Sequence, residues 1–192
     1  MAVMIVPHPV LRRWHRRWGC RDDEAVMPLP GDEFPPEMRL DATHAITIQR
    51  PPADIWPWIV QIGANRGGFY SYDLLENLVG CRLRSANQIV PEWQEPSLGD
   101  LVFLHPKTPG LPIRILDPQR HFVLAETWDF HLIPINANAT RLIVRARGGY
   151  QPSLGNRLLN FVVWHALYEP IHFVMERKMM LGIKRRAERE KA

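Results

Sequence analysis

Two histidines and a tyrosine interrupt an apolar stripe near the C-terminal end of the chain. The stripe has helical spacing and consists of Phe161, His165, Tyr168, His172, Met175 and Met179. Buried imidazole and phenol groups need hydrogen-bond partners, and a polar-lined cavity is one way to supply them. A helix packed in a core would show the same apolar spacing. Because ligand pockets are mostly apolar with few polar groups, His172 is the stronger candidate for a lining residue, ahead of His165.

The same segment contains a spacing that metal sites use. Glu169 and His172 stand at i and i+3, like half of a di-iron carboxylate site, and His165 and Glu176 continue the series. Such a site needs a second pair and two further carboxylates on facing helices, which we do not find, and Pro170 distorts the one pair. We therefore expect no metal and no cofactor, and structural pairing between histidines and glutamates instead.

A glycine-rich loop at residues 63–68 (GANRGG) precedes a group of aromatic and acidic residues. It lacks the GK[ST] of a phosphate-binding loop and does not follow the strand-then-loop order of a nucleotide site, so we expect a lid over a cavity mouth or a tight turn. Arg66 could hold an anionic head group between aromatic walls that include Tyr70 and Tyr72. The alternative is that Arg66 pairs with a nearby acid, Asp73 or Glu76.

One constellation could support acid–base chemistry, namely Tyr70, Tyr72, Glu76 and His172. Glu76 or His172 would be the catalytic base if it were desolvated beside a phenol or an imidazole. The chain has no G-x-S-x-G motif, and no pattern marks either of its two cysteines as a nucleophile. Whether the protein is an enzyme therefore stays open.

Positive charge is concentrated at the two ends of the chain. Residues 1–21 carry five arginines and no acid, and residues 177–192 carry seven basic and two acidic residues, whereas 22–176 hold 12 basic and 18 acidic residues. The body would repel phosphates, so we expect no nucleic-acid partner. The basic ends could contact an anionic membrane or an acidic partner, or they could be solvated helix faces.

Cysteine content and hydropathy restrict the class of protein further. The two cysteines form no CxxC pair, and no apolar run approaches the roughly 18 residues of a membrane-spanning helix. Arginines follow the apolar first eleven residues, which is the reverse of a secretory signal. We expect a cytoplasmic protein, with peripheral membrane contact as an alternative.

The sequence predicts that residues 1–36 form a separate N-terminal unit. Val10–Trp18 has the pattern of a short amphipathic helix, and 20–36 is a proline-rich arm with a helix start at Asp22. We expect the ligand-binding domain to span 37–192. It begins with a strand at His44–Gln49, in which His44, Ile46 and Ile48 share a face.

Two short helices are predicted after this strand. Asp54 can cap the first, which runs to about Ile62. Ser71 can cap the second, Tyr72–Val79, whose expected buried side consists of Leu74, Leu75, Leu78 and Val79.

Alternating and β-branched segments then predict strands at 101–105, 113–116, 121–125, 128–135 and 140–148, with a tight hairpin near Ala125–Thr127. In the last strand, apolar residues alternate with Arg141, Arg145 and Arg147, which predicts an antiparallel sheet with one dry and one wet face. Residues 153–191 have helical composition, either kinked at Pro170 or divided there. The order is that of an α+β fold, with the last helix covering the apolar face of the sheet.

Three stretches resemble the polyketide-cyclase/START-like (SRPBCC) superfamily, and in particular a bacterial subgroup of it. They are Ala45–Gln61 (AITIQRPPADIWPWIVQ), Arg66–Leu78 (RGGFYSYDLLENL) and His172–Glu188 (HFVMERKMMLGIKRRAE). The resemblance covers about Trp18 to Glu188. It implies a helix-grip fold, in which a curved antiparallel sheet wraps around the C-terminal helix and leaves a hydrophobic cavity. It implies a cavity and no particular reaction.

The leading hypothesis is a protein that binds a hydrophobic or amphipathic small molecule, such as a lipid, a polyketide or an aromatic compound. We expect the cavity lining to include Phe103, Trp128, Phe130, His172, Met175 and Met179, and the mouth to include Arg66, Tyr70, Tyr72 and Glu76. The alternatives are a cyclase, dehydratase or hydrolase that uses Glu76 or His172, and a membrane-surface or partner-binding protein that uses its basic ends.

Overall fold

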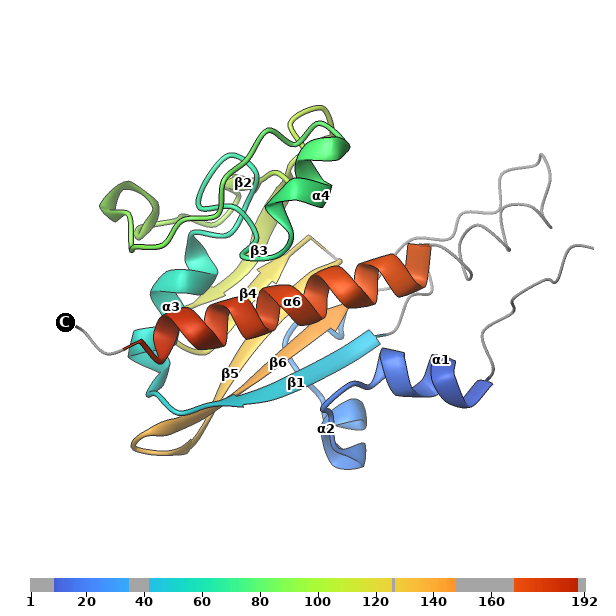
Figure 1. Cartoon of the computed structure of the whole chain (residues 1–192). Helices are drawn as coiled ribbons and strands as arrows, with labels where there is room; N and C mark the ends of the chain where they lie inside the picture. The colour runs from blue at the N-terminus through green and yellow to red at the C-terminus, as the bar shows by residue number, and fades with distance from the viewer. Residues whose placement is uncertain (1–8, 35–41, 126, 148–167, 190–192) are drawn as a thin grey trace, which may run out of the picture.

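The computed structural model describes residues 9–34, 42–125, 127–147 and 168–189. A curved antiparallel sheet of six strands runs in the order β1-β6-β5-β4-β3-β2, and helix α6 lies across one of its faces (Figure 1). The strands are β1 Ala42–Ile48, β2 Leu101–Val102, β3 Leu111–Asp117, β4 His121–Leu124, β5 Trp128–Asn136 and β6 Ala139–Ala146. The α+β class and the sheet-plus-helix arrangement are confirmed.

The hairpins of the sheet follow the turn signals of the sequence. Between β4 and β5 the chain reverses at Ala125, which has a φ of 51°, and the amide of Thr127 donates to the carbonyl oxygen of Leu124 at 3.2 Å. Leu132 of β5 pairs with Leu142 of β6, so the apolar sides of both strands face α6. The predicted division of the long strand near Ala125–Thr127 is therefore confirmed.

Helices α3 and α6 pack on each other over the sheet. Helix α3 spans Pro52–Val60 and follows Pro51 at the N-cap position, so the prediction that Asp54 caps it was wrong. The proline pair suits the first helical turn, where the amide groups need no acceptor within the helix. Helix α6 spans Glu169–Ala187, with Pro170 in its first turn. The predicted helix before Glu169 lies mostly outside the described residues.

Helix α4, Asp73–Leu78, turns its apolar side outward, which contradicts the prediction. Leu74 and Leu78 are 74% and 75% exposed, Leu75 and Val79 are also exposed, and Glu76 is buried. Asn77 holds the following segment by accepting from the amide of Leu83 at 2.8 Å. Cys81 and Leu83 of that segment enter the core in place of the leucines. Ser71 does not cap the helix either, because Tyr72 holds the N-cap position.

The second face of the sheet is covered by the N-terminal arm, so the prediction of a wet face was wrong. The arm contains α2, Asp22–Val26, and contributes Glu24 and Asp32 to this face. Arg141 Nε donates to Glu24 at 2.7 Å, and Arg145 Nη1 donates to Asp32 at 2.7 Å. Charged residues usually face solvent, which predicts exposed arginines on β6, but here acids of the arm cover them.

Helix α1, Pro9–Arg16, lies beside the first turn of α6 (Figure 1). Arg12 donates through Nε and Nη2 to the two carboxylate oxygens of Glu169, at 3.0 and 2.9 Å. This bidentate pair connects the N-terminal unit to the last helix. Among the described residues, no helix has the length and apolar character needed to cross a membrane.

Candidate functional site

A cavity of about 440 Å³ lies between the N-terminal half of α6, the ends of β5 and β6, and the segment that carries α4. Its described lining is mostly apolar and comes from three parts of the fold. The lining residues are Phe69, Ser71, Glu76, Cys81, Leu104, Thr127, Trp128, Ala146, Arg147, Tyr168, His172, Met175, Glu176 and Met179. The volume is within the ordinary range of small-molecule sites.

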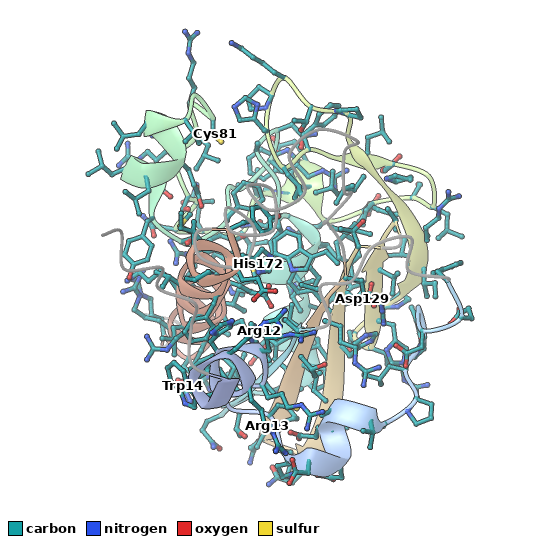
Figure 2. The ribbon with its side chains drawn as sticks, turned by 90° about the vertical axis from the view of Figure 1, so that its right-hand side faces the viewer. Arg12, Arg13, Trp14, Cys81, Asp129 and His172 are labelled. Carbon is teal, nitrogen blue, oxygen red and sulfur yellow. The ribbon has the colours of Figure 1, made fainter. Side chains whose placement is uncertain are left out.

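The wall from α6 matches the stripe seen in the sequence. Tyr168, His172, Met175 and Met179 all line the cavity, because residues three and four apart share one face of a helix. Figure 2 looks along α6 and shows His172 between this helix and the sheet, with Cys81 on the side of α4. Phe161 and His165 of the same stripe lie outside the described residues.

A buried histidine–glutamate group forms one polar part of the wall. Glu176 accepts from His44 Nδ1 at 3.0 Å, and the second carboxylate oxygen lies 3.4 Å from His172 Nε2. The other ring nitrogen of His44 lies 2.6 Å from the carbonyl oxygen of His15, so both nitrogens face acceptors. The expected histidine–glutamate pairing is present for Glu176, whereas Glu169 pairs with Arg12.

The charge states of this group follow from its surroundings. Burial lowers the pKa of His44, but the carboxylate of Glu176 and the carbonyl of His15 raise it more, so the net pKa lies above the ordinary value. An imidazolium that donates from both nitrogens satisfies both acceptors. Burial also lowers the pKa of His172, and Glu176 does not fully offset this effect. His172 is therefore neutral near pH 7.

Glu76 forms the second polar part of the wall, from the side of α4. Its side chain is buried, and no described residue forms a hydrogen bond with its Oε2 atom. Burial, with a smaller contribution from the Asp73 carboxylate, raises the pKa of Glu76 to about 7. Burial and the neighbouring Glu76 raise the pKa of the Cys81 thiol. A carboxyl group with a pKa near 7 can both donate and accept a proton at neutral pH.

The sheet contributes an aromatic wall. Trp128 at the start of β5 contacts the rings of Phe69 and Phe130, with centroids 6.2 and 4.8 Å away. Its indole Nε1–H is buried without an acceptor among the described residues. Arg147 also borders the cavity, but its guanidinium donates to Asp129 and Asp32 on the arm side of the sheet, where Figure 2 shows Asp129.

The predicted residues divide between this cavity and other places. Glu76, Trp128, His172, Met175 and Met179 line it together. Phe130 is packed in the core behind Trp128, and Phe103 lies beside Gly110 in the loops near β2. Phe130 shares a face of β5 with Trp128 but lies two residues further along the strand, within the core, and Phe103 lies just after β2, so neither lines the cavity.

The predicted mouth residues, other than Glu76, lie elsewhere. Arg66 donates to the carbonyl oxygen of Val60 at 3.2 Å and lies 3.7 Å from Asp100, so it pairs with neither of the expected acids. Tyr70 is buried and donates to the carbonyl oxygen of Trp58 at 3.0 Å. Tyr72 is exposed, with Lys178 Nζ 5.3 Å from its ring centroid. Residues 63–68 form a tight turn in which Gly63 pairs with Gly68. Of the two predictions for this loop, a lid or a tight turn, the structure therefore shows the turn.

Sequence reasoning missed several lining residues. Glu176 could have been found, because it stands four residues after His172 on the same helix face. Phe69, Cys81 and Leu104 come from loops whose direction no periodicity reveals. Among the residues that the structure describes, no three histidine, cysteine or acidic side chains gather as a metal site requires.

Comparison with known proteins adds no assignment to this geometry. No protein-family model matches the chain, and no curated protein matches it. The functional argument therefore rests on the cavity and on the groups that line it.

Proposed function

We propose that this protein binds an amphipathic small molecule in the cavity between α6 and the sheet, as a helix-grip protein of the SRPBCC type. The observation that supports this function is an apolar cavity of about 440 Å³ whose wall contains buried polar atoms that no described residue hydrogen-bonds. Buried polar atoms are rarely left unpaired in folded proteins. A bound molecule with a polar end supplies partners for them, and its apolar body occupies the rest of the space.

A pair of tryptophan substitutions on α6 tests this proposal. Met175 lines the cavity, so Met175→Trp fills part of it, whereas Val174→Trp places the same indole at an exposed position of the helix. We expect the uncharged fluorophore N-phenyl-1-naphthylamine to bind the wild type and Val174→Trp at one molecule per chain, and Met175→Trp to lose this binding. Equal binding to both variants would contradict the proposal.

Native mass spectrometry of the freshly purified protein identifies the natural ligand class. We expect an extra mass that denaturing extraction releases from the wild type and from Val174→Trp. Its absence from Met175→Trp would assign it to the cavity. An extra mass retained at the same level in Met175→Trp would place the molecule elsewhere on the protein.

Acid–base catalysis in the same cavity is the second candidate. Its specific support is the pKa of Glu76, about 7, which is suited to proton transfer at neutral pH. An enzyme that lacks its catalytic base binds its substrate but does not convert it. The molecule extracted from Glu76→Gln should then be unreacted substrate, and its mass should differ from that of the molecule extracted from the wild type. His172→Ala tests the other predicted base in the same way. The same molecule from all three proteins would favour binding without reaction.

A membrane-surface role for the basic ends has less support from the described residues. Arg12 is engaged by Glu169, and Arg17 lies 3.6 Å from Asp22. Cytoplasmic location remains a prediction from the sequence. Salt-sensitive binding to anionic lipid vesicles would favour the membrane role, and no binding at low salt would count against it.

A further inference from the structure

Within residues 9–34, 42–125, 127–147 and 168–189, the buried carboxylates have basic partners, with one exception. Glu24 accepts from Arg141, Glu169 from Arg12, and Glu176 from His44. Asp129 accepts from Arg147. Glu76 is only 6% exposed, and no arginine, lysine or histidine of the described chain bonds to it. In the part of the chain that the structure describes, the buried carboxyl group that lacks a basic partner is thus a wall residue of the cavity.

Among the other described lining residues, an anionic head group would find neutral donors such as the Trp128 indole N–H, but no free cation. Glu176 adds a second carboxylate to the wall. Arg147 is the one arginine or lysine among the described lining residues, and its guanidinium is held on the other face of the sheet by Asp129 and Asp32. His172 is neutral because burial lowers its pKa. A bound carboxylate or phosphate would face like charge in a low-dielectric space, which is strongly unfavourable.

We propose that the cavity selects a cationic amphiphile, that is, an apolar or aromatic body with a protonated amine whose N–H groups bind the Glu76 carboxylate. This inference rests on the proposed binding function and specifies its ligand class. The ammonium supplies the basic partner that every other buried carboxylate already has. The rings of Phe69 and Trp128 and the thioethers of Met175 and Met179 enclose the apolar body.

Binding of an ammonium should release a proton from the protein. Near pH 7 about half of the Glu76 side chains carry a proton, because burial and Asp73 raise their pKa to about 7. The ammonium pairs with the ionised form, so each protonated Glu76 loses its proton to buffer when the ligand binds. The other charged or titratable groups at this site are Asp73, Cys81, Arg147, Tyr168, His172 and Glu176.

Isothermal titration with three probes of equal chain length tests the inference. Decylamine, decanol and decanoate, each below its micelle concentration, are titrated into the full-length protein at pH 7. We expect decylamine to bind about tenfold or more tightly than either of the others, as one charge-assisted hydrogen bond to a buried group provides. Titration in phosphate and in Tris should show the release of about half a proton per decylamine.

Two glutamine variants locate the effect. Glu76→Gln should reduce decylamine affinity about tenfold, abolish the proton release and remove most of the preference for decylamine over decanol. The glutamine substitution breaks no hydrogen bond of Glu76 Oε2, so the variant should keep its fold. A thermal melting curve of the variant checks this. Glu95→Gln is the matched control, since Glu95 is exposed and does not line this cavity. It should behave like the wild type.

The outcomes separate this inference from the proposed function. Decanoate or decanol that binds as tightly as decylamine would overturn the cationic specificity and leave the binding function standing. A preference for decylamine that survives Glu76→Gln would also overturn it. If none of the three probes binds, and N-phenyl-1-naphthylamine does not bind either, the proposed function itself is wrong.

Discussion

At the scale of single residues, the buried charges of this protein show two different arrangements. Glu24, Glu169 and Glu176 each lie next to a basic side chain, which compensates for their desolvation. No described residue gives Glu76 such a partner, so burial, with a smaller contribution from the Asp73 carboxylate, favours its neutral form. Glu76 therefore responds to pH near neutrality and to a bound cation.

The stability contribution of Glu76 should depend on pH in a defined direction. Its pKa is raised from 4.5 to about 7 on folding, so the folded protein holds the proton more tightly and loses stability as the pH rises from 4.5 to 7. Glu76→Gln mimics the neutral form. We expect the variant to match the wild type near pH 4.5 and to exceed it by up to about 3 kcal/mol at pH 8. Urea unfolding at both pH values measures this, and a variant that is less stable at pH 8 would contradict it.

The pKa of His44 should stay above its ordinary value only while the carboxylate of Glu176 faces the imidazole. The raised pKa means that the pair adds stability below pH 6.5 and that this contribution is lost as the pH rises through the folded pKa. In Glu176→Gln, burial remains and the counter-charge is gone, so the pKa of His44 should fall below 6.5. The ring ¹⁵N shifts in NMR titrations report both states. His121, on the other face of the sheet, should be unaffected, and an unchanged His44 would refute the assignment.

At the scale of elements, the position of α6 is set by one close contact with the loop before α4. A Cβ atom at Gly182 would lie 2.3 Å from the carbonyl oxygen of Tyr70, so this helix position accepts only glycine without a shift. Tyr70 has a φ of 57°, and Arg186 lies 4.6 Å above its ring. The contact joins α6 to the segment that carries Glu76, and thereby spaces the two acidic walls of the cavity.

Gly182→Ala should therefore destabilise the protein despite the higher helix propensity of alanine. The added methyl must displace either α6 or the backbone at Tyr70, and overpacking of this kind costs about 2 kcal/mol. Thermal or urea unfolding measures the loss. Arg185→Ala, at an exposed position of the same helix, should change stability by less than about 0.5 kcal/mol. A more stable Gly182→Ala would show that the two segments are not in tight contact.

At the scale of the whole molecule, the sheet is enclosed on both faces by segments far apart in the sequence. Helix α6 covers the apolar face, and the N-terminal arm covers the arginines of β6 (Figure 1). The outer layer thus depends on ion pairs, whereas the inner layer depends on apolar burial. Both partners of these ion pairs belong to residues 22–176, so the arm and the sheet neutralise each other within the acidic part of the chain.

Substitution of the acid that holds the arm should loosen this outer layer. Glu24 accepts from Arg141 through both carboxylate oxygens, at 2.7 and 2.8 Å, so Glu24→Gln leaves a largely buried arginine without its counter-charge. We expect a loss of about 3 kcal/mol and faster trypsin cleavage after Arg21. The control is Asp23→Asn, because Asp23 is an exposed neighbour on α2. Trypsin should cleave this variant at the wild-type rate. Equal cleavage of the two variants would mean that the arm is held in another way.

Local patterns in the sequence were sufficient for the elements and for one wall of the cavity. The α+β order, the hairpin at Ala125–Thr127 and the lining by His172, Met175 and Met179 follow from the period of the apolar residues, which is a short-range property. Only the tertiary structure determined which way α4 faces, what covers the arginines of β6 and why Arg66 and Tyr70 lie away from the cavity. These features depend on contacts between distant segments, and Glu76 became a wall residue because Cys81 and Leu83 occupy the core beneath its helix.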